Sequence, residues 1–276
     1  MKHSRRYVAV IVLVLLSLCF LAARSQQQQQ FQPTVGQSGK DVIWVPTPPE
    51  LVTAMLAMAK VTPNDLVMDL GSGDGRIVIA AAKLGATAIG VEFEQSMVDL
   101  SRGNAKMEGV TDKATFIQGD IFETDFSKAT VITMYLLPNL NMKLREKILD
   151  MKPGTRVVSH AFTMEDWESD QTQTVEGRTA YFWIVPAKVN GAWTLQAGSS
   201  AGELSLQQTF QKITGSLKIN GKVLELKNAS LEGASISFSA GDQTYSGAVN
   251  ANSITGTVKD STGRAAKWTA TRRPAM

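Results

Sequence analysis

The stretch Asp69-Leu70-Gly71-Ser72-Gly73-Asp74-Gly75-Arg76 joins a short apolar segment, 66–70, to an apolar segment with helical spacing, 76–84, that Gly85 follows. The first segment predicts a buried strand and the second a helix. Glycine adopts backbone conformations that other residues avoid, so the linker can turn sharply and approach a ligand closely. Because the free N–H groups at the start of the helix face the same turn, the stretch predicts the first strand–loop–helix unit of an α/β domain with a ligand-binding loop.

Strand and helix patterns continue to alternate after this unit. Further strands are predicted at 87–92, 115–118, 130–135 and 156–161, and further helices at 95–108 and 141–151. Two later apolar segments, 171–175 and 179–185, are separated only by Glu176-Gly177-Arg178 and predict a hairpin that adds an antiparallel edge. The pattern predicts a Rossmann-like α/β sheet of seven strands, mostly parallel and covered by helices on both faces.

After Pro186 the sequence changes to short alternating segments without helical periodicity. About eight strands fit between Ala192 and Arg272, which is enough for a small antiparallel β-barrel or sandwich. The sequence therefore predicts an α/β domain at 41–188 and an all-β domain at 189–276.

The N-terminal segment, 1–25, has the layout of an export signal. Basic residues precede an apolar run over 7–23, and Ala23-Arg24-Ser25 is a passable cleavage site. An uncleaved membrane anchor is the alternative, because the run is at the short end of the length that spans a bilayer. In both cases the basic flank stays in the cytoplasm and the rest of the chain lies outside, in the periplasm if the source is bacterial. Residues 26–40 are rich in glutamine and predict a flexible linker.

The formal charge of +3 on the 276 residues conceals an uneven distribution. Residues 1–25 hold four basic residues and no acid, residues 26–188 hold 15 basic and 20 acidic residues, and residues 189–276 hold nine basic and five acidic residues. Because acidic residues outnumber basic ones in the central domain, it lacks the cluster of Lys and Arg residues that nucleic-acid binding requires. The single cysteine, Cys19, lies in the apolar run, so the folded part has no disulfide and no cysteine nucleophile, and we expect no metal site.

Acidic residues follow three predicted strands at the edge where open α/β sheets bind ligands. Asp69 and Glu92 end the first and second strands, Asp74 lies in the glycine-rich turn, and Asp120 follows the third strand. Glu92 is placed to accept hydrogen bonds from both hydroxyls of a ribose. Asp69 and Asp74 would repel a pyrophosphate and would attract a ligand that carries an ammonium and a sulfonium. S-adenosylmethionine has this charge and an adenosine, and Asp120 would then face its adenine.

Each acid also has a purely structural interpretation. Asp74 before a glycine is typical of a turn, Asp120 of a helix N-cap, and Glu92 of a solvated strand end. A nicotinamide-dependent dehydrogenase is an alternative on the same sheet. The dinucleotide fingerprint Gly-x-Gly-x-x-Gly is not met, however, because Arg76 occupies its last position.

Four segments carry a resemblance to a known family: Val45-Pro46-Thr47-Pro48, residues 69–76, Tyr135-Leu136-Leu137-Pro138 and Gly154-Thr-Arg-Val-Val-Ser-His160. They resemble the class I, seven-stranded S-adenosylmethionine-dependent methyltransferases. Within that class they are most similar to the small protein-lysine methyltransferases related to those that act on the ATP synthase c-subunit and the adenine nucleotide translocase. The resemblance covers 41–188 and does not extend to the all-β domain.

The resemblance implies a role for each candidate site residue. Asp69, Gly71 and Gly73, with Ser72 between the glycines, would hold the methionine part of S-adenosylmethionine. Glu92 would hold the ribose and Asp120 the adenine, with Ile121 or Phe122 against the adenine ring. Tyr135 to Asn139 would border the methyl acceptor, where Tyr135 and Asn139 could orient an amine.

The acceptor implied by the resemblance is a protein lysine, and membrane proteins are among the acceptors it implies. Methyl transfer mainly requires that the enzyme align and desolvate its reactants. We expect His160 to be a buried residue at a strand end rather than a general base. A third interpretation is an exported nucleoside-binding protein without catalysis, because S-adenosylmethionine is made in the cytosol.

Overall fold

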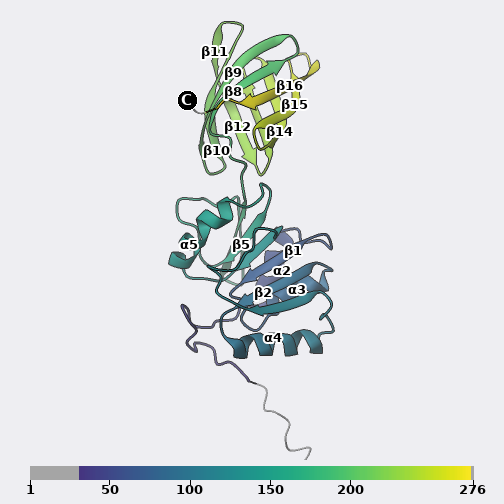
Figure 1. The fold of residues 1–276 in the computed structure, drawn as a ribbon, viewed down its shortest axis with the longest axis vertical. Coiled ribbons are helices and arrows are strands. Elements are labelled where there is room, and N and C mark those ends of the chain that lie inside the picture. Colours follow the sequence, from purple (N-terminus) through teal and green to yellow (C-terminus); the bar gives the residue numbers. More distant parts are fainter. Residues whose placement is uncertain (1–30, 275–276) are drawn as a thin grey trace, which may run out of the picture. The chain divides into compact units, whose positions relative to one another are not determined.

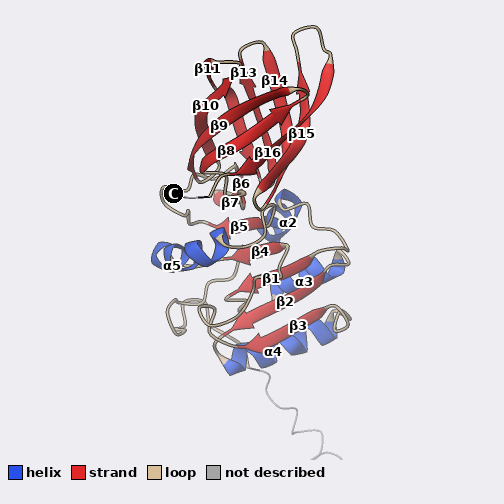
Figure 2. Ribbon diagram, turned by 45° about the horizontal axis from the view of Figure 1, so that its top comes forward, coloured by secondary structure: helices blue, strands red, loops and turns tan. Residues whose placement is uncertain are grey.

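Figure 1 shows the computed structural model of the chain, in which residues 31–274 are described. The first sheet has seven strands in the order β3-β2-β1-β4-β5-β7-β6 (Figure 2). Its strands are β1 (Leu66–Leu70), β2 (Thr87–Glu92), β3 (Ala114–Gln118), β4 (Val131–Met134), β5 (Arg156–His160), β6 (Gln171–Val175) and β7 (Arg178–Ile184). The first five are parallel, whereas β7 runs antiparallel to β5 and pairs with β6 as a hairpin. The predicted seven-stranded sheet and its antiparallel edge are confirmed.

Helices cover both faces of this sheet. The helices α2 (Pro49–Met58), α3 (Arg76–Lys83) and α4 (Gln95–Met107) pack on one face, and α5 (Pro138–Leu149) packs on the other. Successive strand residues point to opposite faces, so Val67 enters the first core and Met68 the second. Because both faces are buried, the central strands are largely apolar on both sides and do not alternate between apolar and polar residues.

Two features of the helices differ from the sequence prediction. The helix α2 was not predicted, and α5 begins at Pro138 rather than at Asn141. Each helix has a proline at its first turn, where the missing N–H has no intrahelical partner to lose. Both prolines therefore begin helices here instead of marking loops.

The second sheet comprises nine antiparallel strands in the order β11-β10-β9-β8-β16-β15-β14-β13-β12. The strands are β8 (Gly191–Ala197), β9 (Ser200–Thr209), β10 (Lys212–Ile219), β11 (Lys222–Glu225), β12 (Lys227–Glu232), β13 (Ser235–Ala240), β14 (Gln243–Asn250), β15 (Ser253–Lys259) and β16 (Ala265–Arg272). The strands β10 and β12 approach each other, so the sheet is nearly closed, as in a barrel. Its interior is filled by side chains, among which Trp193, Tyr245 and Trp268 are fully buried. The predicted all-β fold is confirmed, with nine strands in place of about eight.

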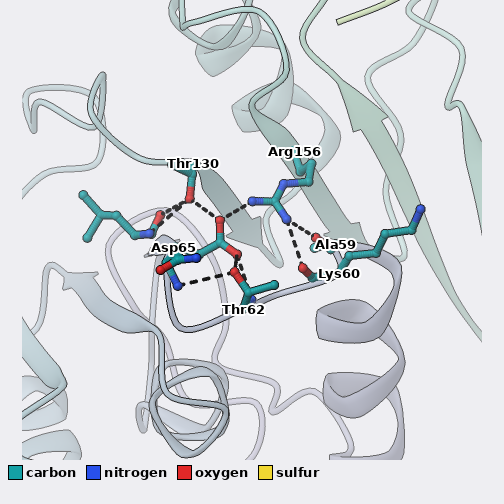
Figure 3. Close-up of polar contacts among 8 residues, drawn as sticks. Ala59, Lys60, Thr62, Asp65, Thr130 and Arg156 are labelled. Carbon is teal, nitrogen blue, oxygen red and sulfur yellow. Dashed lines mark hydrogen bonds and ion pairs between the residues drawn. The ribbon is translucent and has the colours of Figure 1, made fainter.

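A polar cluster around the buried Asp65 ties together the N-terminal ends of β1, β4 and β5 (Figure 3). The Asp65 carboxylate accepts hydrogen bonds from the Thr130 hydroxyl (2.7 Å), the Thr62 N–H (2.8 Å) and the Thr62 hydroxyl (3.0 Å), and it forms an ion pair with Arg156. Arg156 also donates to the carbonyls of Ala59 and Lys60. Burial by itself would raise the pKa of Asp65, but these hydrogen bonds outweigh it and hold the pKa below its usual value.

The predicted export signal or anchor at 1–25 and most of the glutamine tract lie outside the described residues. Within 31–274 no helix is long and apolar enough to cross a membrane. The all-β domain boundary predicted at Lys188 falls in the segment between β7 and β8.

Candidate functional site

A cleft of about 680 Å³ opens at the carboxyl ends of the parallel strands. Eight of the nine predicted site residues line it: Asp69, Gly71, Ser72, Gly73, Glu92, Asp120, Ile121 and Tyr135. They come from the ends of β1, β2, β3 and β4 and from the loops that follow these strands. The parallel sheet thus brings together side chains that are distant in sequence. The ninth residue, Asn139, does not line the cleft.

The glycine-rich loop after β1 has the backbone that its sequence predicts. Gly71, Gly73 and Gly75 all have positive φ angles, of 80°, 55° and 82°. A Cβ atom on Gly73 would lie 2.8 Å from Nε1 of Trp44, so the indole packs directly against this backbone. The Glu92 carboxylate accepts a hydrogen bond from the Gly73 N–H (2.9 Å) and another from the Glu94 N–H (3.1 Å). Glu92 therefore fixes the loop as well as lining the cleft.

Asp69 is the most unusual ionisable group in the cleft. It is 2 % exposed and accepts a hydrogen bond from the Thr133 hydroxyl (2.7 Å). Its pKa is raised to about 7, mainly by burial and to a smaller extent by the nearby carboxylates of Glu92 and Asp74, against the lowering effect of the Thr133 hydrogen bond. A cationic ligand bound beside Asp69 would stabilise the charged form of its carboxyl group.

The other two acids have cationic partners within the chain. Asp74 forms an ion pair with Arg76 (2.6 Å), and Asp120 forms one with Lys40 (2.6 Å). The second oxygen of Asp120 accepts the Phe122 N–H (2.8 Å), and the hydrogen bond from Lys40 is the main cause that lowers the pKa of Asp120. Asp74 therefore contributes less to the attraction of a cation than its position in the sequence suggested, and Asp69 contributes more.

A segment ahead of α2 lines the cleft and was not predicted to do so. We call residues 36–47 the N-terminal strap. Its Ser38 and Ile43 form an antiparallel bridge, and the Trp44 N–H donates to the Gln37 carbonyl (2.9 Å). Lys40 lies over the ring of Phe93, 4.4 Å from its centroid. The sequence placed residues 36–40 in the flexible linker and residues 41–47 in the α/β domain, and it named none of them as a site residue; the bridge and hydrogen bonds of the strap show that the ordered structure begins before residue 41.

An uncharged aromatic wall forms the part of the cleft that follows β4 and β5. Tyr135 and Phe162 line the cleft, and their ring centroids are 6.2 Å apart. His160 is buried, as expected, and its ring lies 3.8 Å from that of Tyr135. Burial, and to a smaller extent the charge of Arg178, lower the pKa of His160 to about 4, so the imidazole is neutral at physiological pH.

The asparagine that supports this wall is Asn141 rather than Asn139. Asn139 is exposed in the first turn of α5, whereas Asn141 is fully buried. The Asn141 amide donates to the Thr163 carbonyl (3.1 Å) in the loop that carries Phe162. The predicted helix began at Asn141, so the sequence pattern did not show that Asn141 lies on the buried face of the helix.

The cleft fits S-adenosylmethionine better than a phosphate-containing nucleotide. The buried, uncompensated Asp69 suits a cation and would repel a pyrophosphate. The Ser72 hydroxyl has no hydrogen-bond partner among the described residues and is buried against Gly90 of β2. Within the described part of the chain no group of His, Cys, Asp and Glu residues is placed to hold a metal ion.

Comparison with known proteins agrees with this assignment. The family model described as ANTKMT methyltransferase domain matches residues 69–171. The chain is 43% identical over 151 residues to the protein-lysine N-methyltransferase of Saccharolobus islandicus, across 52% of this chain and 94% of that protein. It is 35% identical to the human lysine N-methyltransferase of the ATP synthase c-subunit, across 49% of this chain and 57% of that protein.

A solved structure with the same fold is also similar in sequence. It is described as an RNA methyltransferase from Salinibacter ruber in complex with S-adenosyl-L-homocysteine. The identity is 49% and the TM-score 0.51, over 52% of this chain and 96% of that one. These matches support neither the dehydrogenase nor the non-catalytic alternative. The chain belongs to the protein-lysine methyltransferase family and is an S-adenosylmethionine-dependent methyltransferase.

Proposed function

We propose that this enzyme transfers the methyl group of S-adenosylmethionine to the side-chain nitrogen of a lysine, in a protein with an apolar surface. The observation that carries the proposal is the division of the cleft into two parts. Carboxylates lie beside the glycine-rich loop, where they suit the cationic donor, and uncharged aromatic rings form the wall at Tyr135 and Phe162. A wall of this kind desolvates an amine and favours its neutral, nucleophilic form.

In the donor part of the cleft, the residues have the following proposed roles. Asp69 would accept a hydrogen bond from the methionyl ammonium, and the loop of Gly71, Ser72 and Gly73 would lie against the same part of the donor. Glu92 would bond the ribose hydroxyls with its remaining lone pairs. Asp120 would give up its ion pair with Lys40 and accept a hydrogen bond from the adenine amino group, with Ile121 packed against the adenine ring.

S-adenosylmethionine supplies a methyl group on a sulfonium, which leaves as a neutral thioether when a nucleophile takes the methyl. The chain's own residues align the acceptor and exclude water, which is the main requirement of such a displacement. A pKa of about 4 makes His160 too weak a base to deprotonate an amine. We therefore assign the amine proton to solvent, lost before the acceptor is enclosed by Tyr135 and Phe162.

The rim of the cleft suggests the kind of protein that is methylated. Three of its lining residues are exposed apolar side chains: Ile43 is 59% exposed, Phe93 44% and Leu137 41%. Exposed apolar groups around a site are typical of a surface that binds an apolar partner. The names of the relatives that methylate the ATP synthase c-subunit and the adenine nucleotide translocase support a membrane-protein acceptor.

We further propose that residues 1–25 export the chain or anchor it in the cytoplasmic membrane, with the cleft on the outer side. The basic residues before the apolar run support this orientation. A reporter fused after Met276 is expected to be active only outside the cytoplasm, and activity inside the cytoplasm would overturn the proposal.

Binding of the donor should depend on the ionisation of Asp69. Its raised pKa of about 7 means that the free protein holds a proton on this carboxyl at lower pH. That proton must be released before Asp69 can accept from an ammonium, so binding is strong above pH 7 and weakens as the pH falls. Isothermal titration is expected to show the Kd for S-adenosylmethionine rising about tenfold for each pH unit below 7. A Kd that is constant between pH 5.5 and 8 would contradict this role.

The acceptor is tested by methyl transfer from radiolabelled S-adenosylmethionine to the detergent-solubilised c-subunit of ATP synthase. We expect label on a lysine of this acceptor, located by mass spectrometry, and no label when that lysine is changed to arginine. Total RNA serves as the competing acceptor, because the similar Salinibacter protein is described as an RNA methyltransferase. Labelling of RNA and not of protein would overturn the proposed acceptor, while leaving the methyltransferase activity in place.

A further inference from the structure

Behind the aromatic wall lies a contact between two buried polar side chains. Thr47, in the N-terminal strap, is 4% exposed, and its hydroxyl is 3.0 Å from Nδ1 of His160, which is 1% exposed. The His160 ring packs on Tyr135, at 3.8 Å between centroids and a 32° tilt. The strap thus reaches the cleft-lining ring of Tyr135 through one hydrogen bond and one ring contact.

The same threonine is joined to the donor part of the cleft. The Thr47 carbonyl accepts a hydrogen bond from Nη1 of Arg76 (2.8 Å), and Arg76 pairs with Asp74 in the glycine-rich loop. The backbone of Thr47 therefore contacts the first residue of α3, while its side chain contacts the last residue of β5. A single residue connects the two parts of the cleft.

The backbone beyond His160 is held in an uncommon conformation. Ala161 has a φ of 65°, and the Phe162 N–H bonds back to the His160 carbonyl (2.8 Å) in a three-residue turn. Non-glycine residues with positive φ are uncommon and persist where the surroundings fix them. This turn places Phe162 beside Tyr135, so the orientation of His160 affects both rings of the wall.

We propose that Thr47 and His160 are positioning residues that fix the plane of Tyr135 against the methyl acceptor. The inference rests on the proposed function, because it takes Tyr135 to border the acceptor. His160 packs behind Tyr135 and does not itself line the cleft, whereas Thr47 lines it as part of the strap and its hydroxyl is bonded to His160. The neutral imidazole serves as a flat, uncharged support, so the wall presents no positive charge to an incoming amine.

The kinetic test compares Thr47→Val, which removes the hydroxyl at constant shape, with Thr47→Ser, which keeps it. With the ATP synthase c-subunit as acceptor, Thr47→Val should lower kcat by about 10-fold to 100-fold, because small misplacements of bound groups have effects of this size. The Kd for S-adenosylhomocysteine should stay within about twofold of the wild type, and Thr47→Ser should recover most of kcat. Thr53→Val is the matched control, because among the described residues the Thr53 hydroxyl bonds within α2, to the Pro49 carbonyl.

A spectroscopic test needs neither acceptor nor turnover. The full chain has only two histidines, His3 and His160, so its imidazole NMR signals are assigned by the loss of one set in His160→Gln. Stacking on Tyr135 should shift the His160 ring protons upfield in the wild type. Tyr135→Leu should remove this shift, Thr47→Val should change the Nδ1 resonance, and Thr47→Ser should restore it.

The outcomes separate this inference from the proposed function. If the wild type does not bind S-adenosylhomocysteine, the donor site itself fails. If the wild type binds it and Thr47→Val has wild-type kcat and unchanged His160 signals, the positioning role alone is wrong. If Thr47→Val does not fold, Thr47→Ser and the wild-type NMR spectrum decide: His160 protons without an upfield shift, or a Thr47→Ser variant that is folded but inactive, would overturn the inference.

Discussion

Asp69→Asn is expected to weaken binding of S-adenosylmethionine by about 100-fold and, at pH 8, to raise the melting temperature of the ligand-free protein. Asparagine keeps the shape and can still accept the Thr133 hydroxyl, but it cannot offer a charge to an ammonium. A hydrogen bond to a charged group contributes about 1.5–3 kcal/mol, which sets the scale of the lost affinity. Isothermal titration with S-adenosylmethionine measures this loss.

The gain in stability follows from the sign of the pKa shift. A carboxyl whose pKa is higher in the folded state, about 7, than in the unfolded chain destabilises the fold once it ionises, so stability falls as the pH rises from about 4 to 7. The neutral amide removes this cost, and we expect a gain of about 1–3 kcal/mol at pH 8, with about 2–4 °C in melting temperature for each kcal/mol. At pH 4 the gain should disappear.

Asp74→Asn is the matched control for both effects, because Asp74 already has Arg76 as its partner. It should change affinity and stability less than Asp69→Asn. An Asp69→Asn variant that binds S-adenosylmethionine like the wild type would contradict the site as we describe it.

Asp65→Ala is expected to lower the free energy of unfolding by about 3–5 kcal/mol, the usual effect of breaking a buried ion pair. The change leaves Arg156 without its carboxylate and removes the acceptor of the Thr130 and Thr62 hydroxyls. Urea unfolding followed by circular dichroism measures this loss. Asp150→Ala is the control, because Asp150 pairs with Lys188 at the surface, where both side chains are about 70% exposed, and should change stability by less than about 1 kcal/mol.

The cluster should have no direct role in binding, because it lies at the N-terminal ends of the strands, away from the cleft. The folded fraction of Asp65→Ala should therefore keep the wild-type Kd for S-adenosylhomocysteine. Since the pKa of Asp65 is lowered by folding, its contribution to stability is present above the unfolded pKa and is lost as the pH falls through the folded one. Equal stability of variant and wild type at neutral pH would contradict this account of the cluster.

The sequence predicted the parts of the molecule whose pattern is local. Apolar strands, the glycine-rich turn and the position of Glu92 and Asp120 at strand ends indicated the sheet and most of the cleft, because parallel strands bring their carboxyl ends to one edge. The glycine at position 73 likewise indicated that another group packs closely against the backbone there, and in the structure that group is the indole of Trp44.

The parts that could not be predicted depend on contacts between distant segments. No local pattern shows that Lys40 pairs with Asp120, 80 residues later, or that Thr47 reaches His160, 113 residues later. Asn139 was a candidate because the resemblance pointed to Tyr135 to Asn139. The helix was expected to begin three residues late, at Asn141, so the pattern did not show that Asn141 lies on the buried face of α5. Charge counting also overestimated Asp74, because ion pairing with Arg76 is not visible in a sum of charges.

The central claim is that the acids around the glycine-rich loop bind an adenosyl cation rather than a nicotinamide dinucleotide. Isothermal titration of the full chain and of Glu92→Gln with S-adenosylmethionine, S-adenosylhomocysteine and NAD tests it most directly. We predict saturable binding of both adenosyl ligands at one site, weakened at least about tenfold in Glu92→Gln, and no binding of NAD. Binding of NAD without binding of either adenosyl ligand would contradict the account.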